Sequence, residues 1–65
     1  MSTVISDLIL AVVTTKENRD KVTGSTAVFI TEDQEEQSRL CLLLSRILKG
    51  MTHDLENGVF IIVKH

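Results

Sequence analysis

The apolar residues of this chain come in unbroken runs instead of alternating with polar ones. Three such runs cover residues 8–13, 27–30 and 59–63. A strand with one face in water alternates, because successive side chains point to opposite faces of the sheet. An unbroken run predicts a strand that is buried on both faces. Since this 65-residue chain offers one helix to cover them, we expect oligomerisation or a partner to bury the second face of the sheet.

The first two runs predict strands joined by a polar connection. Residues 3–15 are rich in Val, Ile and Thr, which favours a strand. A helix capped by Ser2 is the alternative, and it would place four apolar residues on one face: Ile5, Leu8, Ile9 and Val12. The polar residues 16–21 predict a solvated hairpin connection. Residues 22–31 predict the second strand, with Gly24 at a bulge or bend near its start.

Residues 32–49 predict an amphipathic α-helix. Thr31 and Gln34 fit a capping box at its start, and Gly50 can end it in the left-handed conformation. At about 100° per residue, one arc of this helix collects the apolar side chains that we expect to face the core: Leu40, Cys41, Leu43, Leu44, Ile47, Leu48 and Met51. Leu42 is the exception, because it lies in the middle of the polar face. Beside strands that are buried on both faces, this exposed leucine becomes a candidate contact residue.

The end of the chain predicts a final strand and leaves a short segment open. Residues 51–55 fit either a short strand or a last helical turn. Asn57 and Gly58 form the strongest turn signal, because Asn-Gly readily adopts positive φ. Residues 59–64 then predict the last strand. The expected fold class is α+β: a single domain of residues 1–65 in a β-β-α-β order, with a possible extra short strand before the last and one amphipathic helix on a mainly antiparallel sheet.

Composition favours oligomerisation over the other ways of stabilising so small a domain. Domains of this size commonly rely on disulfides, a metal or a second subunit. The one cysteine, Cys41, excludes an intrachain disulfide and indicates a reducing compartment. One Cys and two His are too few for a structural zinc site without carboxylate ligands, so we expect no metal and no cofactor. A homodimer is then the expected assembly, because it is the commonest closed one.

The sequence also predicts a cytoplasmic protein without a membrane association. Its apolar stretches fall short of the roughly 20 residues that a membrane-spanning helix needs. The N-terminal residues lack the basic start of a signal peptide, and Asp7 interrupts their apolar run.

The residues with catalytic potential are few and scattered. His53 and Asp54 are adjacent, but neighbouring side chains on one element usually point apart. Cys41 lies at the edge of the apolar arc of the helix, where a free cysteine packs as a small hydrophobe. The three glycines are far apart, which excludes a glycine-rich phosphate loop. The chain is therefore not expected to be an enzyme, and a site between subunits built from these three side chains is the third hypothesis.

The leading functional hypothesis is a small homo-oligomeric, protein-binding regulatory module. It would act as an adaptor or inhibitor by occupying a surface on a larger protein, without catalysis. Surplus apolar strand surface and the lack of a chemical motif both favour it. The residues predicted to contact a second copy or a partner are Ile9, Leu42, Val59, Ile61 and Val63.

A dimeric nucleic-acid-binding regulator is the alternative hypothesis. Two helices brought together by dimerisation would join Arg39, Arg46 and Lys49 of each copy into one basic face. The net charge of −2 argues against nucleic acid as the main partner, since such proteins usually carry a basic patch.

Overall fold

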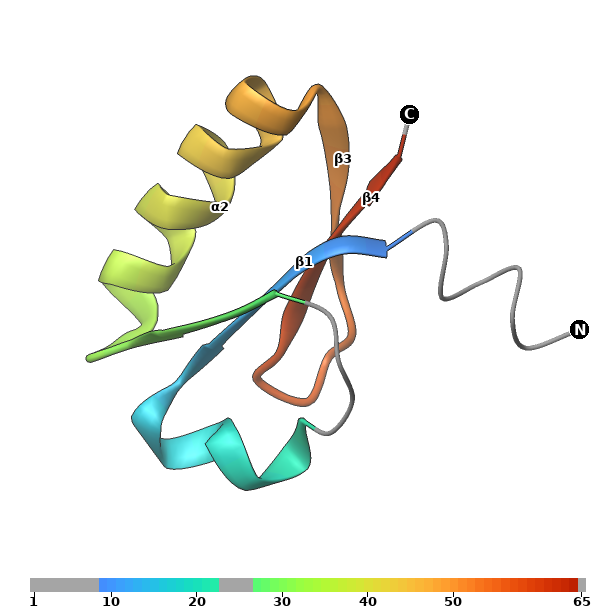
Figure 1. The fold of residues 1–65 in the computed structure, drawn as a ribbon. Helices are drawn as coiled ribbons and strands as arrows, with labels where there is room; N and C mark the ends of the chain where they lie inside the picture. Colours follow the sequence, from blue (N-terminus) through green and yellow to red (C-terminus); the bar gives the residue numbers. More distant parts are fainter. Residues whose placement is uncertain (1–8, 23–26, 65) are drawn as a thin grey trace, which may run out of the picture.

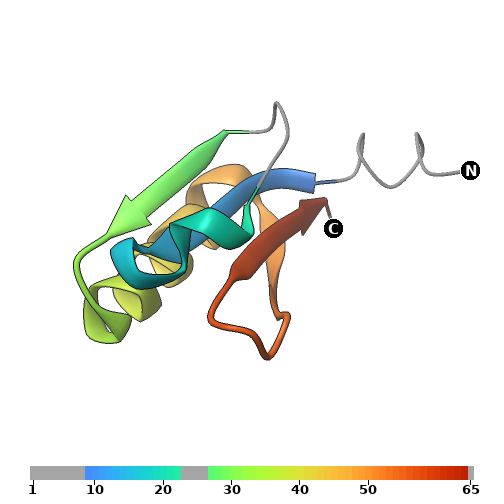
Figure 2. The same ribbon diagram turned by 90° about the horizontal axis from the view of Figure 1, so that it is seen from below.

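A four-stranded mixed sheet with one α-helix packed on it is seen in the computed structural model, which describes residues 9–22 and 27–64 (Figure 1). The strands are β1 (Ile9–Thr15), β2 (Val28–Thr31), β3 (Gly50–Asp54) and β4 (Phe60–Lys64), and the helices are the 3₁₀ helix η1 (Lys16–Lys21) and the α-helix α2 (Gln34–Leu48). The strand order is β2-β1-β4-β3, and Figure 2 shows β2 at one margin of the sheet with β1 between β2 and β4. This arrangement confirms the predicted α+β class.

The first segment forms a strand in its described part, residues 9–15, which confirms the favoured prediction over a helix. Residues 3–8 and Gly24, on which further predictions were made, lie outside the described residues. β4 pairs antiparallel with both β1 and β3, so the extra short strand before the last one is also confirmed. The β-rich composition of β1 decided its structure, because Val and Thr fit the pleated centre of a sheet.

The predicted hairpin between the first two strands is wrong. β2 lies parallel to β1, with Val12 opposite Val28 and Thr15 opposite Thr31. Parallel neighbours need a crossover connection of about a dozen residues, and residues 16–27 provide it. The polar start of this connection forms η1, which contacts both strands, instead of a tight turn.

The helix begins two residues later than predicted. Asp33 is the N-cap residue in place of Thr31, and its carboxylate accepts a hydrogen bond from the Glu36 amide at 2.9 Å. The Glu36 carboxylate in turn accepts from the Glu32 amide at 2.7 Å. Thr31 is still part of β2, where its hydroxyl donates to the Thr14 carbonyl at 2.9 Å. Asp33 and Glu36 therefore cap the start of the helix, but Glu36 accepts from the residue before the N-cap, so the reciprocal bond of a capping box is displaced by one residue.

The helix ends in the left-handed conformation at Lys49 (φ 56°), one residue before the predicted glycine. Gly50 already belongs to β3. A Cβ atom at this position would lie 2.7 Å from the Val63 carbonyl oxygen and 2.8 Å from Cγ2 of Ile62. Glycine is therefore required at residue 50 by the close approach of β4, and not by its own φ angle.

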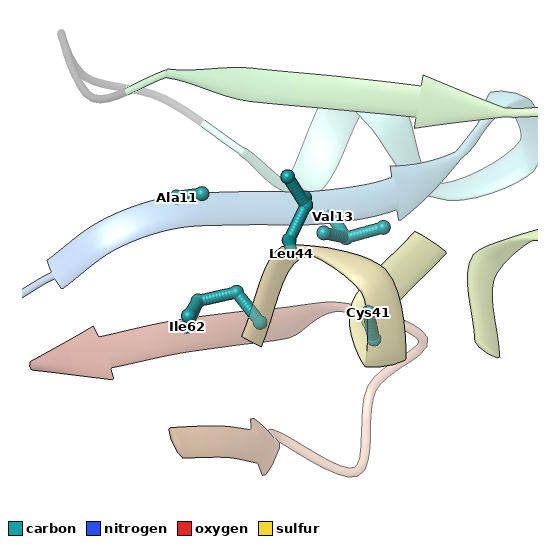
Figure 3. Close-up of a cluster of buried hydrophobic side chains, with 5 residues drawn as sticks. All are labelled: Ala11, Val13, Cys41, Leu44 and Ile62. Carbon is teal, nitrogen blue, oxygen red and sulfur yellow. The ribbon is translucent and has the colours of Figure 1, made fainter. Parts of the chain in front are cut away.

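The hydrophobic core lies between α2 and one face of the sheet, which we call the inner face. Five buried side chains from β1, β4 and α2 meet there (Figure 3): Ala11, Val13, Cys41, Leu44 and Ile62. Leu10, Leu40 and Phe60 pack around this cluster and are partly buried. The centre of the inner face is thus covered by a segment of the same chain, whereas Phe29 at its β2 margin is 36% exposed.

The helix uses a narrower part of its apolar arc than predicted. Cys41 and Leu44 are buried, as expected, but Leu43 and Ile47 are 52% and 63% exposed. Met51, placed on the same arc by the sequence pattern, belongs to β3 instead. The expectation that the whole arc faces the core is therefore wrong.

The contacts of Gln37 explain why α2 is oriented on the sheet so that Leu43 and Ile47 are exposed. The Gln37 side chain is 1% exposed, and its Nε2 atom donates to the carbonyl oxygens of Val13 and Gly58, each at 2.9 Å. A buried amide needs such partners, since an unsatisfied one is costly. These two bonds hold the Gln37 side of the helix against the sheet, and the opposite margin of the apolar arc turns outward.

Candidate protein-binding surface

The side of the sheet away from α2, which we call the outer face, is also apolar. Side chains alternate along a strand, so the neighbours of the core residues Val13 and Ile62 point away from the helix. The strand pairing brings seven apolar residues together on this side: Ile9, Val12, Val28, Ile30, Met51, Ile61 and Val63. Among the described strand residues, those of the outer face include no acidic residue, lysine or arginine.

The margins of the outer face remain accessible. Val28 and Ile30 on β2 are 40% and 45% exposed, and Met51 on β3 is 47% exposed. Ile61 and Val63 on β4, in the middle, are half-buried. On β1, however, the outer-face residues Val12 and Thr14 are buried, at 8% and 0% exposure, so the solvent-exposed apolar surface comes from β2, β3 and β4. An exposed apolar surface with contributions from several strands is typical of a protein-binding site.

A groove adjoins the outer face along the free side of β2. It has a volume of about 420 Å³ and lies between β2 and α2. Ile30 and Thr31 line it from the strand, and Glu36, Arg39, Leu40 and Leu43 line it from the helix. The exposed side chain of Leu43 thus belongs to a concave surface and not to an isolated patch.

The structure brings three of the five predicted contact residues together. Ile9, Ile61 and Val63 lie on the outer face, where Ile9 is paired with Val63 across β1 and β4. Leu42 is exposed on α2, away from the sheet, whereas Val59 is only 3% exposed and offers little surface to a partner.

Sequence reasoning missed the other outer-face residues that are exposed. Val28, Ile30 and Met51 were not among the predicted contacts, although the run at residues 27–30 carried a signal. The missing information was that β2 and β3 form the two margins of the sheet. Position in the strand order, which a local pattern does not contain, decides which apolar strand residues remain exposed.

The residues with catalytic potential do not form one site. His53 pairs with Ile61 on the outer face, whereas Asp54 lies on the opposite side and lines a polar cavity of about 280 Å³. The Asp54 carboxylate accepts a hydrogen bond from the Glu56 amide at 2.7 Å, as in a turn. Burial raises the pKa of the Cys41 thiol, so this side chain is a poor nucleophile at neutral pH. Across residues 9–22 and 27–64, no group of three or more His, Cys, Asp or Glu is placed to hold a metal ion.

The charged side chains around α2 are partly neutralised by one another. Arg39, predicted as a nucleic-acid contact, lies 3.6 Å from the Glu35 carboxylate, and Lys16 lies 2.8 Å from that of Glu32. Arg46 and Lys49, the other two predicted contacts, are exposed near the end of the helix.

Neither helix in the described part of the chain combines the length and the apolar character that crossing a membrane requires.

Comparison with known proteins identifies relatives of this chain. The model of a family described as "Capping complex subunit for YIEGIA" matches residues 6–65. The chain is 40% identical over 65 residues to the Bacillus subtilis (strain 168) protein described as "Uncharacterized protein YpzH", an alignment that covers 100% of this chain and 98% of the relative. No solved structure matches the chain. The family description refers to a subunit of a complex and names no catalytic activity.

Proposed function

Because this chain belongs to the family of capping complex subunits for YIEGIA, we propose that it covers an apolar surface of the YIEGIA protein with its outer face. As a member of this family, the chain has a protein-binding role in a complex. The finer proposal is that it regulates its partner by occupying a surface, without catalysis. We place this complex in the cytoplasm, where the free thiol of Cys41 would stay reduced.

The observation that carries this proposal is the predominantly apolar composition of the outer face, on which Thr14 and His53 are the polar residues of the described strands. All four strands contribute to it, and Val28, Ile30 and Met51 keep 40–47% of their surface exposed. Apolar area removed from water contributes roughly 25 cal/mol per Å². A partner that covers these side chains would therefore gain binding free energy without any rearrangement of the inner face.

Binding of the purified YIEGIA protein to two charge variants tests the proposal. Ile61→Glu places a carboxylate at the centre of the outer face, and we expect it to raise the Kd at least tenfold, or by about 1.4 kcal/mol, because an interfacial charge without a partner is costly. Leu42→Glu is the matched control, since Leu42 is exposed on α2 away from the sheet. Its Kd should stay within about twofold of wild type, a change of less than about 0.5 kcal/mol.

Circular dichroism checks that both variants are folded before affinity is measured, because a folded variant unfolds cooperatively on heating. A folded Ile61→Glu variant that binds as tightly as wild type would contradict the use of the outer face. Loss of binding in Leu42→Glu alone would move the contact to the exposed side of α2.

A homodimer through the same face is the second candidate. Its uncharged apolar composition favours it, because such a surface is complementary to a second copy of itself. Light scattering after size exclusion checks this on wild type and Ile61→Glu. A dimeric mass that the variant loses would support self-association, and a monomeric wild type at high protein concentration would remove it.

A further inference from the structure

The edge of the sheet at β2 gives the proposed complex a second mode of contact. We infer that an extended, uncharged segment of the YIEGIA protein pairs with β2 and continues the sheet as a fifth strand. This inference rests on the proposed function and deepens it, because it specifies which part of the partner is bound and through which atoms.

The backbone of β2 presents hydrogen-bonding groups to solvent at two positions. The Val12 amide donates to the Ala27 carbonyl at 2.8 Å, which fixes the phase of the parallel ladder between β1 and β2. Backbone groups of successive residues point to alternate sides of a strand. Phe29 therefore directs its N–H and C=O toward β1, whereas Val28 and Ile30 direct theirs away from the sheet.

The two edges of the sheet differ in their protection against such pairing. β3, at one edge, contains the charged residue Asp54 next to His53, and charged residues on an edge strand discourage strand addition. β2, at the other edge, reads Val-Phe-Ile-Thr, with no charge and no proline. Natural edge strands are usually protected, so the bare edge at β2 indicates that a strand covers it in the complex.

The surroundings of β2 define the chemistry of that strand. Arg39, at the rim of the groove, is paired with Glu35, and Glu36 is engaged at the start of the helix. Because these charged side chains are already engaged, the rim of the groove suits a partner segment without charged residues. Side chains on one side of an added strand would enter the groove beside Leu40 and Leu43, and those on the other side would extend the outer face.

The size of the outer face supports an extended contact. Four strands about 4.8 Å apart and roughly 16 Å long span a flat area of only about 300 Å². A stable interface usually buries about 800 Å² on each partner. The outer face alone is too small for that, and the adjoining edge of β2 with its groove is the continuation that the fold offers.

Amide hydrogen exchange of the full chain, alone and with the YIEGIA protein, tests the pairing residue by residue. In the free chain, we expect the Val28 and Ile30 amides to exchange fast and the Phe29 amide to exchange slowly. In the complex, Val28 and Ile30 should slow at least tenfold, because their N–H groups would donate to the added strand. Protection of both amides in the chain alone, increasing with its concentration, would assign the edge to a second copy and overturn the inference.

Proline variants test the same atoms by affinity. Ile30→Pro removes one outward N–H at an edge position that tolerates proline, and we expect about a tenfold rise in Kd for the YIEGIA protein. Ile30→Ala keeps the N–H and should weaken binding less than Ile30→Pro. Thr52→Pro is the matched control, because the ladder between β3 and β4 places the Thr52 N–H on the opposite edge. Its Kd should match that of wild type.

The outcomes separate this inference from the proposed function. A wild-type chain that does not bind the YIEGIA protein contradicts both. Tight binding that depends on Ile61 but leaves the Val28 and Ile30 amides unprotected retains the proposed function and overturns strand pairing. If Ile30→Pro does not fold, the exchange experiment on the wild-type chain decides the question.

Discussion

The two faces of the sheet are similar in composition and differ in what covers them. Val13 and Ile62 on the inner face are fully buried under α2, whereas Val28 and Ile30 on the outer face remain exposed at its β2 margin. Side chains of the same type thus serve two purposes in one small domain. The inner face supplies stability to the chain, and the outer face holds apolar surface that another molecule can cover. Hydrophobicity alone does not distinguish a core from an interface. The position of the helix and the strand order decide it together, because Val12 on the central strand β1 is only 8% exposed although it lies on the outer face.

Truncation of adjacent isoleucines should give the largest difference between the faces. Ile62→Ala removes a side chain from the fully buried core, and we expect the free energy of unfolding to fall by about 2–5 kcal/mol. Ile61→Ala, one residue earlier on the half-buried outer face, should cost clearly less. Urea denaturation of both variants measures the two changes. Equal losses would contradict the distinction between a covered and an open face.

Removal of the buried amide should have an intermediate effect. Gln37→Leu leaves the carbonyls of Val13 and Gly58 without their side-chain donor, and we expect a loss of about 1–3 kcal/mol in the free energy of unfolding. Gln34→Leu is the matched control, because Gln34 is exposed in the first turn of the same helix. A stability of Gln37→Leu equal to that of the control would show that α2 does not need this anchor.

Features set by interactions between neighbouring residues could be predicted from the sequence, and features set by contacts between distant residues could not. The strand at β1 and the amphipathic helix were predictable, because local composition and periodicity specify them. The parallel pairing of β1 and β2 was not, since it depends on the tertiary arrangement of the two strands and not on the local pattern of either one. Similarly, Gln37 was absent from the predicted core, because only the tertiary structure reveals the two carbonyls that accept from it.

The sequence predicted that the sheet has an apolar second face, but it identified only some of the residues on that face. Unbroken apolar runs correctly predicted an apolar second face, and Ile9, Ile61 and Val63 were placed on it. Leu42 could not be assigned from its helical position, because a lone exposed leucine is common. Val59 belongs to an apolar run, yet it is buried beside the turn before β4.

Polar substitution at the margin of the outer face should give the smallest change in stability. Met51 on β3 is 47% exposed, so Met51→Ser should alter the free energy of unfolding by less than about 0.5 kcal/mol. The same variant should weaken binding of the YIEGIA protein, because the partner would lose apolar contact area. Isothermal titration calorimetry and urea denaturation measure the two effects on one preparation. A marked loss of stability would place Met51 in the core of the free chain.

Methyl-group NMR of the chain titrated with the YIEGIA protein tests the central claim most directly. Selective labelling of isoleucine, leucine and valine reports both faces of the sheet and the exposed side of α2 in one experiment. The account predicts that the methyl signals of Val28, Ile30, Ile61 and Val63 shift on binding, while those of Leu42 stay in place. Shifts confined to Leu42 and its neighbours on α2, with the outer face unchanged, would contradict it.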